Sequence, residues 1–241
     1  MQSKLTAYIA VALISSLGIL AGCGGGTSKP SIGTDIDYSF AQTIDGWEFG
    51  FSDYTRLTKP TDVELVHAVI PITGASKALY MGGTNLSDDL LLYTTRKITG
   101  LLPNATYAGN FTVTFASDAP GGCAGVGGSP GESVWLIGAV TPTKPETTQK
   151  GEDIRLNISR GNQATAGDSS DVLGTVGVSG IPCTSDNRQA AFKTLGPGKW
   201  IPFTTDATGS AWILVGLDSG FEAYSRIWLQ SVKFTYQPRV L

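Results

Sequence analysis

Along most of the chain after residue 46, apolar residues recur at every second position or form short continuous runs. In Thr106–Ala116, Tyr107, Phe111, Val113 and Phe115 fall on one face, with threonine and asparagine opposite. A half-buried antiparallel strand requires this alternation. Ten segments bounded by turn residues are predicted as strands: Trp47–Tyr54, Glu64–Ile70, Ala78–Met81, Leu90–Ile98, Thr106–Ala116, Ser133–Val140, Ile154–Ile158, Trp200–Thr204, Ala211–Leu217 and Arg226–Tyr236.

No segment shows a convincing helical period. Residues 35–241 are therefore predicted to form a single all-β domain, an antiparallel β-sandwich with enough residues for a substantial core.

The composition agrees with this fold class and excludes several others. The 241 residues include 31 glycines, and only 15% of them are charged, compared with a usual share of about 25%. This balance excludes a coiled coil, a helical bundle and a charge-rich disordered chain. A net charge of −3 with no basic cluster argues against nucleic-acid binding. One histidine and three cysteines argue against a His/Cys zinc site.

The first residues have the pattern of an export signal. Lys4 precedes an apolar stretch from Ala7 to Leu20, which is short for a membrane span. The stretch ends in Leu-Ala-Gly-Cys, which resembles the lipobox of bacterial lipoproteins. In that family the cysteine, here Cys23, carries the lipid and the chain is cut before it. The resemblance implies a signal peptide at 1–22 and anchoring to a membrane through Cys23; an ordinary signal peptide is the alternative.

Residues 23–34 are rich in glycine and are predicted to be a flexible tether between the lipid and the domain that starts at Asp35. Gly24 follows the cysteine, where an aspartate would indicate retention in the inner membrane of enterobacteria. The expected location is thus the bacterial cell envelope, with the outer membrane favoured in a host with two membranes.

Export also bears on the other two cysteines. Cys123 and Cys183 would lie in an oxidising compartment, so we predict a disulfide between them, the alternative being two buried free thiols. They occur in two long stretches predicted to be irregular, Ser117–Glu132 and Ser159–Asn187. A disulfide would make these stretches either a rigid rim at one end of the sandwich or loops joined for resistance to proteolysis.

Five segments resemble the galactose-binding-like jelly roll of carbohydrate-binding modules: Phe40–Trp47, Lys77–Gly83, Ile98–Phe115, Thr204–Val215 and Arg226–Phe234. The resemblance implies that fold and a glycan ligand. Many members hold calcium through a glutamate and an aspartate, but the corresponding positions are Ala41 and Gln230. Neither side chain supplies a carboxylate, so no cofactor is expected, although calcium is still conceivable.

Three further segments resemble a family of uncharacterised bacterial lipoproteins: Asn85–Tyr93, Gly121–Ser133 and Asp218–Glu222. That family has no secure activity, so the resemblance implies no mechanism.

A hydrolase motif is excluded on chemical grounds. Gly127–Gly131 matches the G-x-S-x-G pattern of a nucleophile elbow. The residue after the serine must donate its backbone N–H to the oxyanion, and Pro130 has none. The single histidine, His67, lies in a predicted strand and is expected to be an ordinary strand residue.

The carboxylates are the remaining catalytic candidates. Asp88 and Asp89 are adjacent, so in a strand they would point to opposite faces; a turn-capping role is expected. Asp218 and Glu222 lie close together in the chain, and with Glu132 they could form an acid–base pair for glycoside cleavage or bind a cation. The simpler expectation is that they accept hydrogen bonds from backbone groups in a turn.

Aromatic residues could provide flat surfaces on which sugar rings stack. Trp200 follows Gly-Pro-Gly-Lys and is the best candidate for an exposed platform, and Tyr54 beside Asp53 is the second. The predicted ligand-binding residues are Trp200, Tyr54, Asp53, Asp88, Asp218 and Glu222.

Together these features predict a lipid-anchored β-sandwich that binds a glycan or another ligand without catalysis. One alternative is a glycan-active enzyme that uses Glu132, Asp218 and Glu222. Another is a structural or assembly lipoprotein that contacts an envelope protein.

Overall fold

The computed structural model describes residues 33–184 and 188–239. The expected signal peptide, Cys23 and the tether up to residue 32 lie outside the described residues. The chain divides into two units, Met1–Ser31 and Ile32–Leu241, and the fold below is that of the second. In the described ranges, no helix is long and apolar enough to cross a membrane.

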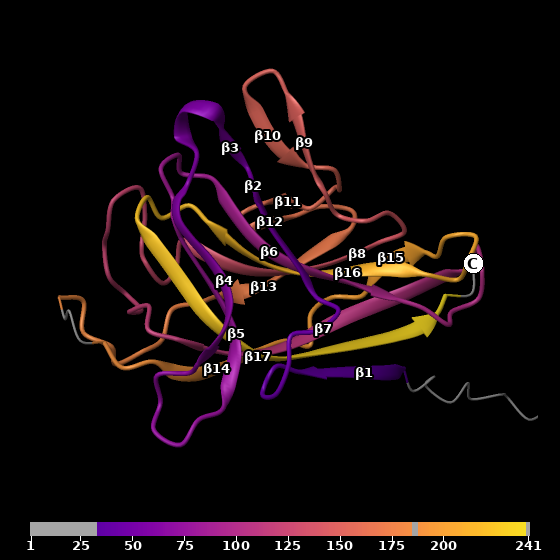
Figure 1. The fold of residues 1–241 in the computed structure, drawn as a ribbon, viewed down its shortest axis with the longest axis horizontal. Helices are drawn as coiled ribbons and strands as arrows, with labels where there is room; N and C mark the ends of the chain where they lie inside the picture. The colour runs from indigo at the N-terminus through magenta and orange to yellow at the C-terminus, as the bar shows by residue number, and fades with distance from the viewer. Residues whose placement is uncertain (1–32, 185–187, 240–241) are drawn as a thin grey trace, which may run out of the picture. The chain divides into compact units, whose positions relative to one another are not determined.

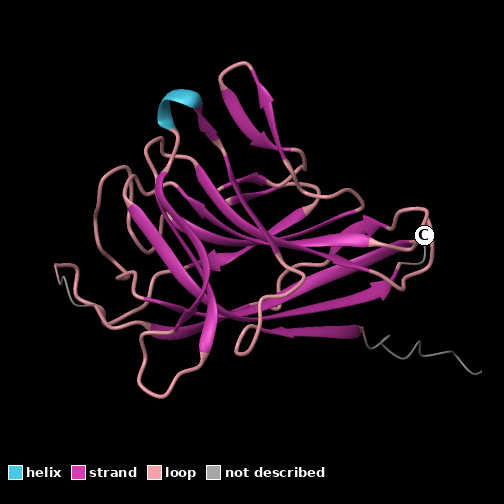
Figure 2. Cartoon of the chain, in the orientation of Figure 1, coloured by secondary structure: helices cyan, strands magenta, loops and turns pink. Residues whose placement is uncertain are grey.

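Two antiparallel sheets pack against each other (Figure 1). Figure 2 shows that the described residues contain very little helix. The larger sheet has the order β14-β7-β17-β5-β4, with β1 paired to β17 and β15 paired to β7. Its strands are β1 (Thr34–Ser39), β4 (Thr61–Val69), β5 (Lys77–Thr84), β7 (Thr106–Ser117), β14 (Ala191–Leu195), β15 (Ile201–Thr204) and β17 (Tyr224–Pro238).

The smaller sheet has the order β13-β8-β16-β6-β2. Its strands are β2 (Glu48–Ser52), β6 (Leu90–Ile98), β8 (Val134–Thr141), β13 (Ser170–Thr175) and β16 (Ala211–Ser219). The remaining elements are β3 (Tyr54–Thr55), the 3-10 helix η1 (Arg56–Thr58), β9 (Thr147–Lys150), β10 (Asp153–Leu156), β11 (Gly161–Asn162) and β12 (Thr165–Ala166).

Several successive strands alternate between the two sheets, although β4 and β5 both belong to the larger one. β5 and β7 belong to the larger sheet, whereas β6 and β8 belong to the smaller one, and β16 and β17 are divided in the same way. This arrangement confirms the predicted antiparallel β-sandwich of jelly-roll type.

The main core fills the space between the sheets. Phe111, Val113 and Phe115 of β7 are fully buried there, together with Leu136 of β8 and Val215 of β16. Burying an apolar side chain of this size contributes about 1.5–3 kcal/mol. The apolar face that the alternation in β7 predicted is therefore buried in the core.

The smaller sheet is also covered on its outer face. Leu91 and Tyr93 of β6 and Leu214 of β16 form a second apolar cluster with Leu156, which lies in the segment between β8 and β13. Burial on both sides explains why Leu90–Tyr93 is apolar at consecutive positions and does not alternate.

Every predicted strand segment overlaps an observed strand, but four longer strands were not predicted: β1, β9, β13 and β14. All residues of β9 are exposed, so β9 has no apolar face to detect, whereas β1 offers only the two partly buried residues Ile36 and Tyr38. The prediction that Ser159–Asn187 is irregular was wrong in part, because it includes β13, whose pairing with β8 is interrupted by a bulge at Val172 and Gly174.

The predicted disulfide between Cys123 and Cys183 is confirmed, and it joins residues 60 positions apart. Next to it, the Gly121 amide donates to the Val178 carbonyl and the Val178 amide donates to the Ala119 carbonyl, both at 2.9 Å. The two cysteine loops are therefore connected by backbone hydrogen bonds as well as by the covalent bond.

Candidate functional site

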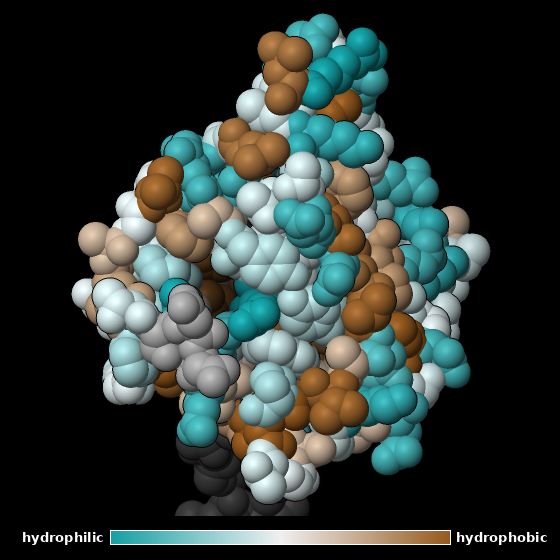
Figure 3. Space-filling view, turned by 60° about the vertical axis from the view of Figure 1, so that its left-hand side comes forward, coloured by the Kyte–Doolittle hydropathy of each residue, from teal (hydrophilic) through white to brown (hydrophobic). Residues whose placement is uncertain are grey.

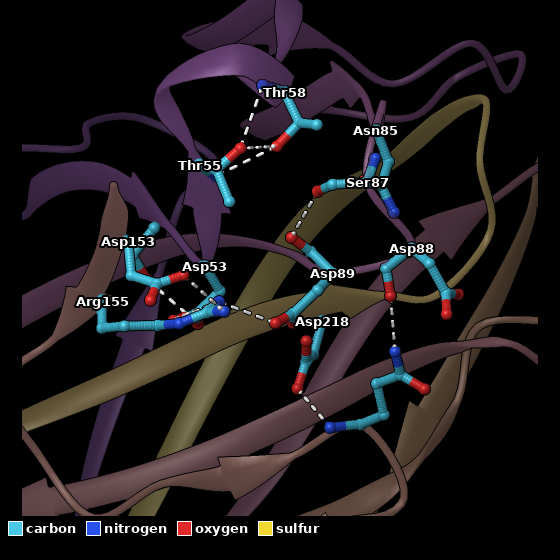
Figure 4. Close-up of polar contacts among 12 residues, drawn as sticks. Asp53, Thr55, Thr58, Asn85, Ser87, Asp88, Asp89, Asp153, Arg155 and Asp218 are labelled. Atoms are coloured by element: carbon cyan, nitrogen blue, oxygen red, sulfur yellow. Dashed lines mark hydrogen bonds and ion pairs between the residues drawn. The ribbon is translucent and has the colours of Figure 1, made fainter. Parts of the chain in front are cut away.

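A cluster of charged side chains lies on the outer face of the smaller sheet, beneath the segment that contains β10 and β11. It consists of Asp53 after β2, Asp89 before β6, Arg155 in β10, Arg160 before β11 and Asp218 in β16. Figure 4 shows Asp53, Asp89, Arg155 and Asp218 converging from these separate elements.

Arg160 is the buried centre of the cluster. Its Nη1 group donates to Asp218 Oδ2 at 2.5 Å, and its Nη2 group donates to Asp53 Oδ2. Asp218 Oδ2 also accepts the backbone N–H of Gln163 at 2.7 Å. The side chains of Arg160, Asp53 and Asp218 are only 6%, 4% and 0% exposed. Such buried charges are tolerated only when they are paired and hydrogen-bonded.

Arg155 forms the outer layer and is 44% exposed. It donates to Asp89 Oδ2 at 2.7 Å and lies 3.7 Å from Asp53 Oδ1 and 3.5 Å from Asp153 Oδ1. Asp89 Oδ1 is 3.7 Å from the Nη2 atom of Arg160. Asp89 is thus positioned between both arginines, at the boundary between the buried layer and the exposed one.

The cluster has an excess of negative charge, since Asp53, Asp89 and Asp218 face two guanidinium groups. Burial raises the pKa of Asp218 to about 6, because the loss of water outweighs the attraction of Arg160. Burial and the nearby Asp53 raise the pKa of Asp89. Among the described residues, one buried carboxyl oxygen of Asp89 and one of Asp218 have no hydrogen-bond partner.

A cavity of about 350 Å³ opens beside the cluster. Its lining residues are Asp53, Asp89, Arg155, Leu156, Ile158, Arg160, Gly161 and Asn162. The cavity therefore places carboxylate acceptors and guanidinium and amide donors next to two apolar side chains, the mixture that small-ligand sites commonly show.

Four of the six predicted ligand-binding residues lie in or near this cluster. Asp53 and Asp218 belong to it, and Tyr54 follows Asp53 with its ring stacked on Phe51 at 5.5 Å between centroids. Asp88 contributes its backbone carbonyl, which accepts from the side chain of Gln163 at 2.7 Å. Its carboxylate points away from that of Asp89 (Figure 4), in line with the expectation that the two diverge.

Trp200 lies elsewhere, in the segment before β15. Its side chain is 44% exposed and lines a shallow cavity of about 520 Å³ with Ala108, Pro202, Gln237, Pro238 and Arg239. Trp200 is therefore accessible, as a platform must be, but Asp53 and Asp218 do not line its cavity.

The proposed catalytic carboxylates do not form one group. Glu132 accepts from the Gly122 amide at 2.9 Å and from the Ser129 hydroxyl, and this latter bond lowers the pKa of Glu132. Glu222 is exposed and donates its backbone N–H to Val126 at 2.9 Å. Glu132 thus lies in the Cys123 loop, and Glu222 lies in the turn between β16 and β17 that bonds to this loop, whereas Asp218 bonds to Arg160 and Gln163.

Ala41 and Gln230, which stand where the related modules have calcium ligands, lie close together in the fold. The amide of Phe40, the residue before Ala41, donates to the Gln230 carbonyl at 2.9 Å. Within residues 33–184 and 188–239, no three His, Cys, Asp or Glu side chains are grouped in a way that could hold a metal ion.

Sequence reasoning missed Arg160, Arg155 and the role of Asp89. A usable signal was present at Asp218, since a carboxylate at the end of the apolar run Ala211–Leu217 is expected to be buried. A buried carboxylate needs a cationic partner, but nothing in the chain indicates that this partner is Arg160, 58 positions away.

No known protein family matches the chain, and no curated protein matches it either. Several solved structures are similar at low identity. A carbohydrate-binding module of the β-sandwich superfamily is 12% identical over 78% of this chain, with a TM-score of 0.36, and the match spans only 56% of that module's own chain. A module studied for mannan recognition is 14% identical over 87% of this chain and 98% of its own, with a TM-score of 0.33. The K1 cleaved adhesin domain of Lys-gingipain from Porphyromonas gingivalis W83 is 14% identical over 86% of this chain and 100% of its own, with a TM-score of 0.34.

Proposed function

We propose that this protein binds a neutral glycan without cleaving it, in the cavity beside Asp89, Arg155 and Asn162. The observation that carries the proposal is the buried Asp89 carboxyl oxygen that lacks a hydrogen-bond partner among the described residues. Buried acceptors are nearly always hydrogen-bonded, and the hydroxyl of a sugar is a suitable donor. Asp89 lines the cavity and its side chain is 22% exposed, so a bound ligand meets this carboxylate at its accessible edge, next to the buried oxygen.

The hydrogen-bond donors in the same cavity can pair with the acceptor oxygens of a sugar. The Arg155 guanidinium is fixed by Asp89, and Asn162 offers an amide that donates and accepts. Neighbouring hydroxyls on a sugar ring both donate and accept, so they pair with a carboxylate and a guanidinium at once. The negative excess of the cluster favours a neutral sugar over an acidic one.

The burial of the cluster supports binding over catalysis. Glycoside cleavage needs two carboxyl groups that both face the scissile bond. Asp53 and Asp218 are buried against Arg160, which leaves Asp89 as the partly accessible carboxylate of the three. A glycan-active enzyme is the alternative, and the release of sugars would support it.

The proposed setting of this binding protein is the bacterial envelope. The Leu-Ala-Gly-Cys ending of the apolar leader supports lipid attachment at Cys23, and Gly24 supports the outer membrane. Labelling of cells with a radioactive or alkyne fatty acid tests the anchor, because a Cys23→Ser variant would then carry no label.

Binding is tested with the full chain in detergent, by thermal shift against a panel of neutral oligosaccharides. A ligand that binds only the folded state raises Tm in a saturable way. We expect Asp89→Asn and Arg155→Gln to abolish the shift, and Asp37→Asn, which alters an exposed carboxylate on β1, to retain it. Trp200→Ala would abolish the shift only if the Trp200 cavity were the binding site.

Two results would contradict the proposal. One is the absence of any shift with neutral glycans, and co-purification of an envelope protein would then favour the assembly role. The other is an unchanged shift in Asp89→Asn, which would exclude this cavity as the site.

A further inference from the structure

The exposed side chain of Trp200 belongs to a fixed part of the larger sheet. In the turn before it, the Gly198 amide donates to the Phe111 carbonyl at 2.9 Å, and the Lys199 amide donates to Asp171 Oδ2 at 2.7 Å. The chain after Trp200 continues directly into β15, which pairs with β7. The ring is therefore held in place from both sides, although 44% of the residue is exposed.

Three neighbours extend this platform. Pro202 of β15 and Pro238 at the end of β17 are exposed nonpolar residues, and Arg239 is an exposed cationic one. Together with Trp200 they line the cavity of about 520 Å³ described above, and we call these four residues the Trp200 surface. Tryptophan favours the boundary between water and lipid, where its ring lies at the level of the headgroups, and a nearby cation suits the headgroup phosphates.

A partner that adds a strand is disfavoured at this place. Among the described residues β15 pairs only with β7, so its other side is an edge of the larger sheet. Pro202 lies inside this short strand and has no N–H to donate. Proline on an edge strand hinders pairing with a further strand. The Trp200 surface is thus suited to a contact made through side chains.

The described chain begins beside this surface. A Cβ atom at Gly33 would lie 2.6 Å from Thr235 Cγ2 and 3.5 Å from Trp200 Cη2, so the backbone of Gly33 passes close to the ring. Gly33 comes ten residues after Cys23, the proposed site of lipid attachment. Ten residues span at most about 35 Å when extended, and about 16–19 Å on average as a flexible coil. A lipid on Cys23 would therefore keep the Trp200 surface close to the membrane.

The Trp200 surface and the Asp89 cavity lie on opposite faces of the sandwich. Ile201 and Phe203 are buried in the core, so Pro202 between them points to the outer face of the larger sheet. The Asp89 cavity lies on the outer face of the smaller sheet, beside β10 and β11. Figure 1 shows β1 of the larger sheet at the bottom and β10 at the top. Figure 3 turns the left-hand end of that view forward and shows hydrophilic and hydrophobic residues mixed between the two faces.

We propose that the Trp200 surface docks on the headgroup region of a lipid bilayer and so turns the Asp89 cavity away from the membrane. This proposal rests on the lipid attachment at Cys23 proposed above. The lipid holds the chain at the membrane, and Trp200 determines which face of the sandwich meets it. The Asp89 cavity then stays open to glycans in the surrounding water.

The test measures which tryptophan contacts lipid. The natural chain, purified with its lipid, is reconstituted into vesicles of phosphatidylethanolamine and phosphatidylglycerol with acyl chains brominated near the headgroup, because bromine quenches tryptophan fluorescence only on contact. We expect quenching in the natural chain and the loss of most of it in Trp200→Phe. Trp135→Phe is the matched control, since Trp135 pairs with Asp218 in the smaller sheet, and it should retain the quenching. An unchanged Tm confirms that both variants are folded.

Two results would overturn the inference: no quenching in the natural chain on vesicles, or unchanged quenching in Trp200→Phe. A thermal shift with a neutral glycan that is lost in Trp200→Ala would overturn it as well, because the ring would then be a sugar platform.

Fatty-acid labelling of Cys23 separates this inference from the proposal on which it rests. A labelled chain without quenching retains the anchor and rejects the docking surface. Quenching of Trp200 in a chain without label rejects the anchor and retains the docking surface. Neither result alters the effect expected for Asp89→Asn on glycan binding.

Discussion

Arg160 and Arg226 show how differently one sandwich uses the same kind of ion pair. Arg160 is buried beneath the β10–β11 segment and is shared by Asp53 and Asp218, whereas Arg226 is 40% exposed and pairs with Asp118. Both are held by short charge-assisted bonds. The cluster around Arg160 has three carboxylates, those of Asp53, Asp89 and Asp218, for the two guanidinium groups of Arg155 and Arg160.

The difference indicates that burial decides what such a pair does. A buried arginine shared by two carboxylates has most of its hydrogen-bonding capacity occupied, so it connects strands and stabilises their arrangement. A pair that is partly open to solvent is screened by water, so it contributes less to the stability of the fold. The variants below test this division.

The largest effect is expected for Arg160→Met. Without the guanidinium, Asp53 and Asp218 become buried charges that lack their main partner, and removal of one member of a buried pair costs about 3–5 kcal/mol. Urea unfolding at pH 7 measures this loss, with Arg56→Met as the matched control at an exposed position. A loss similar to that of the control would show that the cluster does not stabilise the fold.

The Cys123→Ser, Cys183→Ser pair is expected to lose slightly less, about 2–4 kcal/mol, because the bond closes a loop across 60 positions of the chain. Binding of neutral glycans should persist in this variant, because no residue of the Cys123 loop lines the Asp89 cavity. Loss of that binding in a folded protein would contradict the separation between the disulfide and the site.

A change of pH should act on the buried cluster through Asp218, whose folded pKa of about 6 lies above its ordinary value of 3.8. The folded state then binds the proton more tightly, so this group's contribution to stability falls as pH rises from about 4 to about 7. In Asp218→Asn this contribution is absent. We therefore expect the variant's stability relative to the natural chain to increase over that range, by about 2–3 kcal/mol. Other carboxylates titrate alike in both proteins, so a difference that does not vary with pH would contradict the assignment.

The smallest effect is expected for the paired variant Arg226→Gln with Asp118→Asn, at about 1 kcal/mol or less, because the pair is partly exposed and its joint removal leaves no buried carboxylate unpaired. Urea unfolding of this variant beside Arg160→Met gives the comparison directly. A loss as large as that of Arg160→Met would mean that the partly exposed pair is as important for the fold as the buried one.

Much of the fold could be predicted because apolar periodicity is a local property. Leu90–Ile98 was predicted with the bounds that β6 has, and the β7 prediction differs from the observed strand by one residue. Strands without an apolar face were missed, such as the fully exposed β9, because main-chain pairing with a neighbour leaves no mark on side-chain polarity.

The charged sites depended on a different kind of information. Asp53 and Asp218 were recognised as candidate residues, but Arg160 was not, because it is 107 positions from Asp53 and 58 from Asp218. Arg226 and Asp118 are 108 positions apart, and their pairing arises where the end of β7 meets β17.

The sequence by itself determined the fold class, most of the strand positions and the prediction that Cys123 and Cys183 form a disulfide, because each follows from local pattern or from the counting of residues. The tertiary structure alone decided which carboxylate meets which arginine and which of those pairs is open to solvent. The physical reason is that the strength of an ion pair depends on distance and on the exclusion of water, and both arise only when strands far apart in the chain are packed together.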